Sequence, residues 1–297
     1  MVIETDIFDD VDDVGALVVA HALADEGTVE IAAVLVNTPS RWGGLAVAAI
    51  NRAFGRPGIP VGSLAELDDR VARNDFAHAL VQAHGREDDS RAIEPAGRLW
   101  NRVLDSAADH SLTLVSLGFY GILVGLLDDA GADTVARKIE RAAVMGGRFP
   151  SGVEYNFAAA PELTRAMLTR WPTPLDLLGW EIGAEIETGR GLTSSDRVDL
   201  VSSAYRAFCG RRGGRPSWDL LAVLLAVDPE RWGFELSPPG SVAVEADGHN
   251  TWTPEAAGRM RYTTAIRNPI EVARALDAML EGAIDRRFRP RAVRDLT

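Results

Sequence analysis

Short apolar segments alternate with segments of helical periodicity along the first two thirds of the chain. The apolar runs that predict buried strands lie at 2–3, 29–37, 59–62, 112–118, 142–147 and 173–180. The segments with helical spacing lie between them, at 14–27, 43–55, 96–110, 120–130 and 160–171. Nearly continuous apolar strands separated by helices are typical of a parallel sheet that is covered on both faces. The sequence therefore predicts an α/β fold with an open, mostly parallel, doubly wound sheet flanked by helices.

The chain beyond residue 190 follows a different pattern. Helices are predicted there at 194–209, 217–227 and 269–284, and antiparallel strands at 241–248 and 260–266. Ser217 is placed to act as the N-cap of the second of these helices. The sequence contains neither an internal repeat nor a linker long enough to divide the chain, so we predict a single domain over residues 1–297.

The composition restricts the cellular setting and the partners. The net charge is −12 at pH 7, which argues against a nucleic-acid backbone or an anionic membrane as the main partner. Cys209 is the single cysteine, so no internal disulfide can form, which suits a reducing compartment. No apolar run approaches the roughly 20 residues of a membrane helix, and the first residues do not form a secretory signal. We therefore expect a cytoplasmic protein that acts on a small molecule.

A run of acidic residues stands between the first predicted strand and the first predicted helix. It places six carboxylates within ten positions: Glu4, Asp6, Asp9, Asp10, Asp12 and Asp13. Like charges this close repel one another, so folding them together costs free energy unless a cation or hydrogen-bond donors compensate. A metal site is one interpretation, and a solvated acidic loop is the other. A hard cation such as Ca²⁺ takes six to eight oxygen ligands, so distant residues must contribute, and Asp219 in the first turn of a later helix is a candidate.

Other motifs that contain clustered acids do not fit this context. The segment DDVDD (9–13) matches the diphosphate-binding pattern of terpenoid synthases, but that pattern belongs on a helix of an all-helical fold. An EF-hand loop that started at Asp6 would need a glycine and a glutamate where the sequence has Val11 and Leu17. Neither a GxGxxG pattern nor a P-loop is present.

The segment ETDIFDDVDDVGAL (4–17) resembles the amino-terminal signature DTDPGxDDxxAL of the inosine–uridine-preferring nucleoside hydrolases. It is more similar still to a divergent branch of that family, which has two additional residues in the signature and SWD in place of the HD motif. The resemblance continues in family order through AINRAFGRPGIPVG (49–62), LVSLGFYGILVGLL (114–127), VMGGRFPSGVEYNF (144–157), WPTPLDLLGWEIG (171–183) and GRPSWDLLAVLLAV (214–227). It implies a Ca²⁺-dependent hydrolase that cleaves the N-glycosidic bond of a ribonucleoside or a close analogue.

The resemblance also implies a set of metal ligands. Asp6 matches the aspartate that binds calcium and accepts a proton from the attacking water. Asp13 and Asp219 match two further carboxylate ligands. Leu117 falls where the family supplies a backbone carbonyl to the metal.

A second implied set of residues contacts the sugar. Asp12 matches the aspartate that hydrogen-bonds the 2′-hydroxyl group. Glu154 and Asn156, in EYNF, match a pair that binds the sugar hydroxyls. Asn37 matches a further ribose-binding asparagine, and Met145 lies where the family places an apolar contact with the sugar, with core packing as its alternative.

Departures from the family pattern affect the expected substrate. Many members have a histidine where this chain has Trp218, and that histidine protonates the leaving base. Trp218 is expected either to stack on the base, where cation–π attraction favours its protonated form, or to pack against the sheet. Phe8 replaces the usual glycine, which predicts a remodelled turn with an aromatic ring near the sugar or the base. Asp9 is expected to be a solvated charge.

Two functional hypotheses follow from the resemblance. The first is a hydrolase of a nucleoside-like small molecule, assembled as a homo-oligomer (a dimer or a tetramer), which binds neither nucleic acid nor membranes. The second is a non-catalytic or repurposed homologue that binds a ribosyl ligand and metal without hydrolysis. Release of the base from a panel of nucleosides separates the two.

Overall fold

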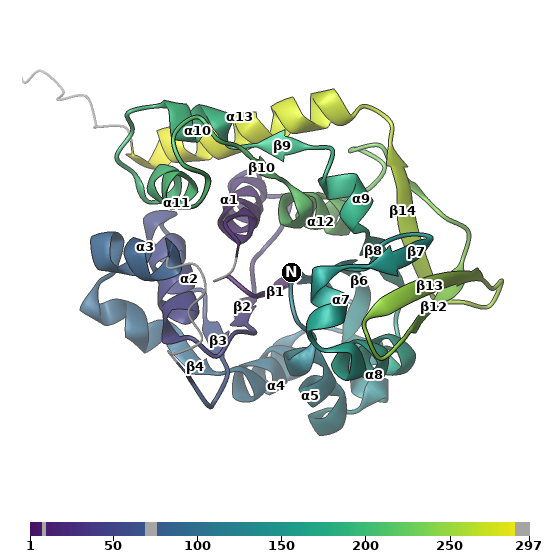
Figure 1. Cartoon of the computed structure of the whole chain (residues 1–297). Helices are drawn as coiled ribbons and strands as arrows, with labels where there is room; N and C mark the ends of the chain where they lie inside the picture. Colours follow the sequence, from purple (N-terminus) through teal and green to yellow (C-terminus); the bar gives the residue numbers. More distant parts are fainter. Residues whose placement is uncertain (8–9, 69–75, 289–297) are drawn as a thin grey trace, which may run out of the picture.

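The computed structural model describes residues 1–7, 10–68 and 76–288 (Figure 1). The strands are β1 Val2–Thr5, β2 Ala33–Val36, β3 Val61–Ser63, β4 Ile93–Pro95, β5 Leu112–Ser116, β6 Ile139–Met145, β7 Ser151–Val153, β8 Leu175–Leu178, β9 Glu187–Thr188, β10 Arg215–Pro216, β11 Phe234–Leu236, β12 Gly240–Val244, β13 His249–Pro254 and β14 Met260–Ile266. The α-helices are α1 Asp12–Asp25, α2 Arg41–Ala53, α3 Phe76–His84, α4 Ala96–Ser106, α5 Gly121–Asp129, α6 Ala132–Lys138, α7 Tyr155–Ala159, α8 Pro161–Arg170, α9 Trp180–Gly183, α10 Arg190–Ser194, α11 Leu200–Cys209, α12 Trp218–Val227 and α13 Pro269–Phe288. None of the helices in these ranges combines the length and the apolar character needed to cross a lipid bilayer.

Most of the described strands belong to one twelve-stranded sheet. Its order is β4-β3-β2-β1-β5-β6-β8-β14-β12-β13-β7, and β11 pairs with β14. The strands from β4 to β14 in this order are parallel, whereas β11, β12, β13 and β7 pair in the antiparallel sense. The predicted fold class, an open and mostly parallel sheet flanked by helices, is confirmed.

Helices cover both faces of the central strands, as Figure 1 shows. Successive side chains of a strand point to opposite faces of the sheet. Ile3 and Val34 belong to a core that is shared with α1, α2 and α12, whereas Val2 and Ala33 belong to a core that is shared with α4, α5 and α8. Because both faces are buried, β2 is apolar at all of its positions and β1 is apolar at Val2 and Ile3, whereas the buried Glu4 and Thr5 of β1 are polar.

The C-terminal third differs from the prediction in two respects. The segment 194–209 is not one helix, because Asp199 separates α10 from α11 and caps α11 by accepting a hydrogen bond from the Ser202 backbone N–H at 2.8 Å. The segment 260–266 is a strand that pairs in the antiparallel sense with β11 and, at Met260, with β12, as predicted, but β14 also runs parallel to β8. The antiparallel partner of β12 along its length is β13.

The order of the strands in the sheet reverses at β1, because β2 to β4 extend to one side of it and β5, β6 and β8 extend to the other. This strand has β2 on one side and β5 on the other, and both run parallel to it. In open parallel sheets, ligands bind outside the carboxyl ends of the strands at such a point. Asp6 follows β1 directly and Leu117 follows β5 directly. The fold therefore brings these two residues to the edge of the sheet where a ligand site is expected.

Candidate functional site

A cavity of about 350 Å³ lies at this edge of the sheet. Its described lining comes from the carboxyl ends of β1, β5 and β6, from β10, and from the first residues of α1, α7, α9 and α12. The lining residues are Asp6, Asp10, Asp12, Asp13, Leu117, Met145, Glu154, Tyr155, Asn156, Trp180, Arg215, Trp218 and Asp219. All of the residues that the sequence resemblance assigns to the site are among them, apart from Asn37 and Phe8. Phe8 and Asp9 lie outside the described residues.

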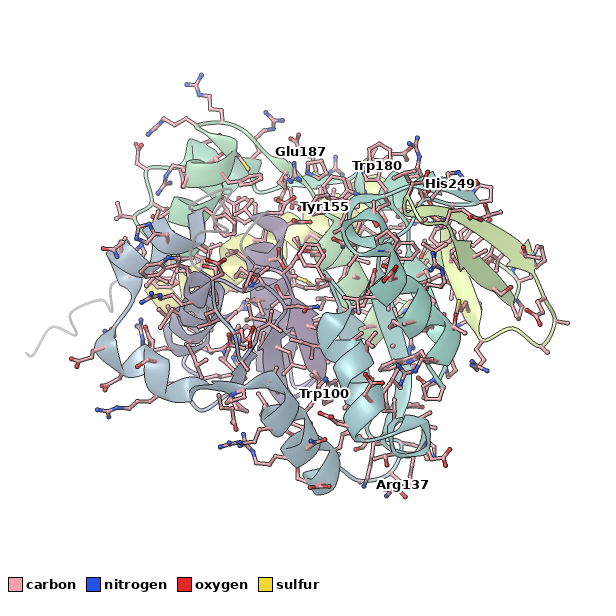
Figure 2. All side chains as sticks on the ribbon, turned by 60° about the horizontal axis from the view of Figure 1, so that its bottom comes forward. Trp100, Arg137, Tyr155, Trp180, Glu187 and His249 are labelled. Carbon is pink, nitrogen blue, oxygen red and sulfur yellow. The ribbon has the colours of Figure 1, made fainter. Side chains whose placement is uncertain are left out.

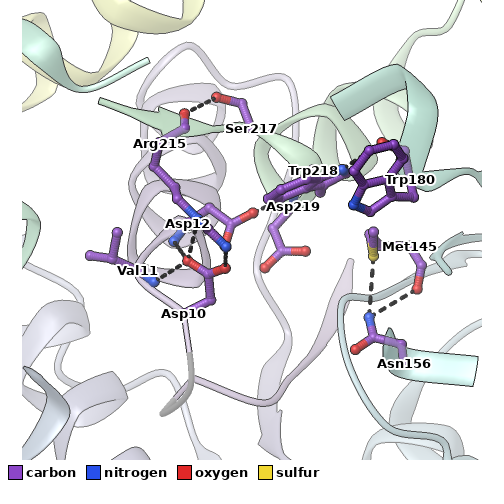
Figure 3. Close-up of polar contacts among 10 residues, drawn as sticks. All are labelled: Asp10, Val11, Asp12, Met145, Asn156, Trp180, Arg215, Ser217, Trp218 and Asp219. Atoms are coloured by element: carbon purple, nitrogen blue, oxygen red, sulfur yellow. Dashed lines mark hydrogen bonds and ion pairs between the residues drawn. The ribbon is translucent and has the colours of Figure 1, made fainter. Parts of the chain in front are cut away.

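Three aspartates of the cavity form a tight cluster at the meeting point of two helices, and Figure 3 shows two of them, Asp12 and Asp219. Asp12 and Asp13 stand in the first turn of α1, and Asp219 stands in the first turn of α12. Each offers one carboxylate oxygen, and these oxygens lie within 4.8 Å of one another. The helices are held together here by a hydrogen bond from the Asp219 backbone N–H to Asp12 Oδ2 at 3.3 Å. The three side chains are buried, with at most 4% of their surface exposed, so a solvated acidic loop is the wrong description of this part of the run.

The surroundings of Asp13 fit a bound cation. The Thr5 hydroxyl donates a hydrogen bond to Asp13 Oδ1. Asp13 Oδ2 is buried and has no hydrogen-bond partner among the described residues. An unpartnered buried carboxylate oxygen costs free energy that a metal ion can offset. Since the donor set consists of carboxylate oxygens, it fits a hard divalent cation such as Ca²⁺.

The pKa values of the three clustered aspartates also favour a bound cation. Burial raises the pKa of Asp12, Asp13 and Asp219 well above the usual carboxyl range, and the charges of neighbouring acids raise these pKa values further. A divalent cation at the centre of the cluster would reverse this effect by favouring the charged forms. The cluster is therefore costly without a cation and suited to holding one.

Asp6 and Leu117 border the cluster from the sheet. Asp6 is 7% exposed and follows β1, and its charge contributes to the raised pKa of Asp13 and Asp219. Its carboxylate oxygen is not one of the three that lie within 4.8 Å of one another. The Leu117 carbonyl accepts a hydrogen bond from Asn156 Nδ2 at 3.0 Å and has a second lone pair for another partner.

Glu154 and Asn156, two of the residues expected to contact the sugar, line the cavity at the start of α7. Glu154 is the N-cap of α7, and its carboxylate accepts hydrogen bonds from the backbone N–H groups of Asn156, Phe157 and Gly147 at 2.8, 3.1 and 2.9 Å. The Asn156 side-chain amide donates to the Leu117 carbonyl and also lies 3.2 Å from Met145 Sδ. The contact with Met145 is drawn in Figure 3. These contacts fix the orientation of both polar side chains toward the cavity.

Asn37 and Glu4 form a hydrogen-bonded group next to the cavity. Asn37 Nδ2 donates to Glu4 Oε1 at 2.8 Å, and the Ser116 hydroxyl donates to the other carboxylate oxygen. Glu4 is fully buried, and burial raises its pKa well above the usual range. Asn37 does not belong to the described lining of the cavity, so its contact with ribose stays a prediction. Glu4, which replaces the first aspartate of the family signature, holds Asn37 and Ser116 in place.

Aromatic side chains form the outer wall. Trp218 both packs against the core and lines the cavity, and its Nε1 donates to the Trp180 carbonyl at 2.7 Å. Trp180 and Tyr155 lie at the same end of the molecule, 40% and 49% exposed (Figure 2). Sequence reasoning missed these two residues, although Tyr155 stands inside the EYNF segment. Ser217 is the N-cap of α12 by position only, because its hydroxyl bonds Thr188 Oγ1 at 2.7 Å and does not cap the helix.

Comparison with known proteins identifies the architecture. No family model matches the sequence, and no curated protein matches it either. Among solved structures, an inosine-guanosine nucleoside hydrolase is similar with a TM-score of 0.76 at 19% identity, over 94% of this chain and 98% of that one. The inosine-uridine preferring nucleoside hydrolase from Bacillus anthracis has a TM-score of 0.70 at 16% identity, with coverage of 94% and 98%. The type III effector protein XopQ, complexed with adenosine diphosphate ribose, has a TM-score of 0.70 at 16% identity, with coverage of 95% and 93%. The chain thus has the nucleoside hydrolase fold, as the resemblance of its motifs predicts.

Proposed function

We propose that this protein is a Ca²⁺-dependent hydrolase that cleaves the N-glycosidic bond of a ribonucleoside or a close analogue and releases base and ribose. The observation that carries the proposal is the buried cluster of Asp12, Asp13 and Asp219, with one unpartnered carboxylate oxygen, in a cavity that also has an aromatic wall. The acidic part suits a metal ion and a developing positive charge, and the aromatic part suits a planar base.

The ligands proposed for the cation are the carboxylates of Asp6, Asp13 and Asp219 and the carbonyl oxygen of Leu117. When bound, the cation would act as a Lewis acid that lowers the pKa of water and orients it together with the sugar hydroxyls. The nucleoside hydrolase motifs and the shared cavity lining support this set. Calcium is preferred to transition metals because the donors are all oxygens.

The roles of the protein groups follow from the charge that cleavage creates. Breaking the N-glycosidic bond gives the sugar oxocarbenium character, so carboxylates near the ribose stabilise the transition state. Asp6 is proposed to accept a proton from the attacking water. Asp12 is proposed to accept a hydrogen bond from the 2′-hydroxyl group, and Glu154 and Asn156 to bind the remaining sugar hydroxyls. Met145 supplies an apolar contact at the same end of the cavity.

The proposed setting rests on composition and resemblance. A net charge of −12 supports a small-molecule substrate over nucleic acid. The single cysteine supports a reducing compartment, which we propose to be the cytoplasm. The resemblance to the nucleoside hydrolases supports a homo-oligomer.

A base-release assay tests the proposal directly. The purified protein is incubated with a panel of purine and pyrimidine ribonucleosides, with CaCl₂ or with EDTA, and its metal content is measured. We expect base release from at least one nucleoside in CaCl₂ and its loss in EDTA. Binding of ribosyl ligands without any release would instead support the second candidate, a ribosyl-binding protein that has no hydrolase activity. The similarity to XopQ, whose structure contains adenosine diphosphate ribose, favours keeping that candidate.

Gly118→Ala is expected to lower base release by about 100-fold, because small displacements of a catalytic group are costly. A Cβ atom at position 118 would lie 2.5 Å from Asp6 Cγ, so the Asp6 carboxylate would have to move. The measurement is kcat/KM for the best nucleoside. Gly125→Ala is the matched control, because a Cβ atom there meets nothing within 4 Å. Wild-type activity in Gly118→Ala would contradict the catalytic placement of Asp6.

Two substitutions are expected to separate the sugar end of the cavity from its base end. Asn156→Ala removes a side chain at the sugar end, so we expect it to weaken every ribosyl ligand by a similar factor. Trp218→Ala removes part of the aromatic wall, so we expect it to change the preference among bases. Competition assays with ribose and with several nucleosides measure both effects. A change of base preference in Asn156→Ala without one in Trp218→Ala would reverse the proposed orientation of the substrate.

A further inference from the structure

An ion pair joins the segments that precede α1 and α12, the two helices that carry the aspartate cluster. Arg215 Nε lies 2.8 Å from Asp10 Oδ1, and Arg215 Nη2 contacts Asp10 Oδ2 (Figure 3). The two residues are 205 positions apart in the sequence. Both hydrogen bonds run between one guanidinium and one carboxylate, a bidentate arrangement that fixes orientation as well as distance.

Each partner of this ion pair is itself anchored. Asp10 Oδ1 also accepts hydrogen bonds from the backbone N–H groups of the next two residues, at 2.6 and 3.4 Å, so it holds the start of α1. The Arg215 guanidinium lies against the rings of Phe208 and Trp218, with Cζ 5.2 and 5.0 Å from the ring centroids. The ion pair therefore links the first turn of α1 to the segment that leads into α12.

We propose that the Asp10–Arg215 ion pair positions the metal ligands by setting the separation between the carboxylates of α1 and Asp219 of α12. This inference rests on the metal site of the proposed function. Asp10 and Arg215 are about a quarter exposed (25% and 29%), so the ion pair lies mostly within the wall of the cavity. Its effect is geometric, because the three clustered oxygens come from helices whose first turns it ties together. Groups that orient metal ligands typically contribute about 10–100-fold to metal affinity.

A purely electrostatic role of Arg215 and a positioning role predict opposite changes in the Kd for Ca²⁺ when Arg215 is replaced by alanine. Removal of the guanidinium takes a positive charge away from a cavity lined by carboxylates, and electrostatics alone would then tighten Ca²⁺ binding. Loss of the ion pair would instead release α1 from the segment before α12 and spread the ligands, which weakens Ca²⁺ binding. The direction of the change in Kd therefore separates a positioning role from a purely electrostatic one.

Isothermal titration calorimetry of the full chain with CaCl₂ measures this change. We expect Arg215→Ala and Asp10→Asn each to raise the Kd for Ca²⁺ by about 10–100-fold. The double variant should be no weaker than the weaker single variant, because both substitutions remove the same interaction. Arg215→Lys keeps the charge but loses the planar fork, so we expect it to recover only part of the affinity. If the melting curve of Arg215→Ala in EDTA shows that this variant does not fold, Arg215→Lys is used in its place.

Arg211→Ala is the matched control. Arg211 precedes Arg215 by four positions, and it pairs with Asp196 at 2.9 Å, where both side chains are more than two thirds exposed. The substitution removes the same charge without touching the ion pair of the cavity, so we expect a Kd within about twofold of wild type. An unchanged or lower Kd in Arg215→Ala would overturn the positioning role alone. A wild-type protein that binds no Ca²⁺ would overturn the proposed function as well.

Discussion

Asp6→Asn is expected to abolish release of the base from any nucleoside that the wild-type protein hydrolyses. The amide keeps the shape of the side chain but cannot accept the proton of the attacking water, and a general base contributes typically ~10²–10⁴-fold to the rate. Asp6 is also a proposed Ca²⁺ ligand, so a weaker metal site adds to the loss. Steady-state kcat/KM at saturating CaCl₂ measures the effect, and single-turnover assays separate the chemical step from binding.

Two controls make this result specific to position 6. Asp133→Asn makes the same chemical change at an exposed carboxylate of α6, and we expect wild-type activity. Asp9→Asn makes the same change within the acidic run, and we expect little change in turnover because the sequence indicates a solvated charge there. Full base release in Asp6→Asn would mean that Asp6 is not the catalytic base and that our assignment is wrong.

The central sheet could be predicted because strands that are buried on both faces tend to be apolar at consecutive positions, and this pattern can be recognised in the sequence. Strands such as β2 are apolar at every position. The antiparallel strands β7, β12 and β13 at the edge of the sheet do not have this pattern. In β13, Asn250 is fully buried because its side chain bonds the backbone of Arg148, accepting from the N–H and donating to the carbonyl, each at 2.8 Å. A polar residue that is buried for its hydrogen bonds cannot be found by a search for apolar alternation.

The acidic run could be interpreted only in part from the sequence. Asp12 and Asp13 start a helix, and a metal site is one natural use of adjacent acids there. The same reasoning could not separate these residues from Glu4 and Asp10, which have other partners. Glu4 accepts hydrogen bonds from Asn37, which follows β2, and from Ser116 at the end of β5, and Asp10 pairs with Arg215. Which donor compensates which acid depends on how strands and loops meet, and spacing along the chain does not contain that information.

Calcium is expected to raise the melting temperature of the protein, and to raise it more at pH 8 than at pH 5. Burial raises the pKa of Asp12, Asp13 and Asp219 in the folded state above the unfolded value of about 4. The folded chain therefore holds more protons than the unfolded chain, so its metal-free stability falls as the pH rises from about 4 through these raised pKa values. Protons compete with Ca²⁺ for the same oxygens, so Ca²⁺ affinity rises over the same interval. Melting curves in EDTA and in CaCl₂ at the two pH values measure the difference.

The Asp219→Asn variant tests this prediction further, because we expect the substitution to reduce the stabilisation by Ca²⁺ and yet to raise the melting temperature in EDTA. At 100 times its Kd, Ca²⁺ stabilises the folded wild-type protein by about 2.7 kcal/mol, and loss of one carboxylate ligand should remove most of that shift. In EDTA at pH 8 the same substitution should raise the melting temperature, because an amide at position 219 does not repel the neighbouring buried carboxylates. In the absence of the cation, the protein is thus expected to be more stable once one of the cation's carboxylate ligands has been replaced by a neutral group. If Asp219→Asn keeps the calcium shift and lowers the melting temperature in EDTA, the cluster has a structural role and calcium binds elsewhere.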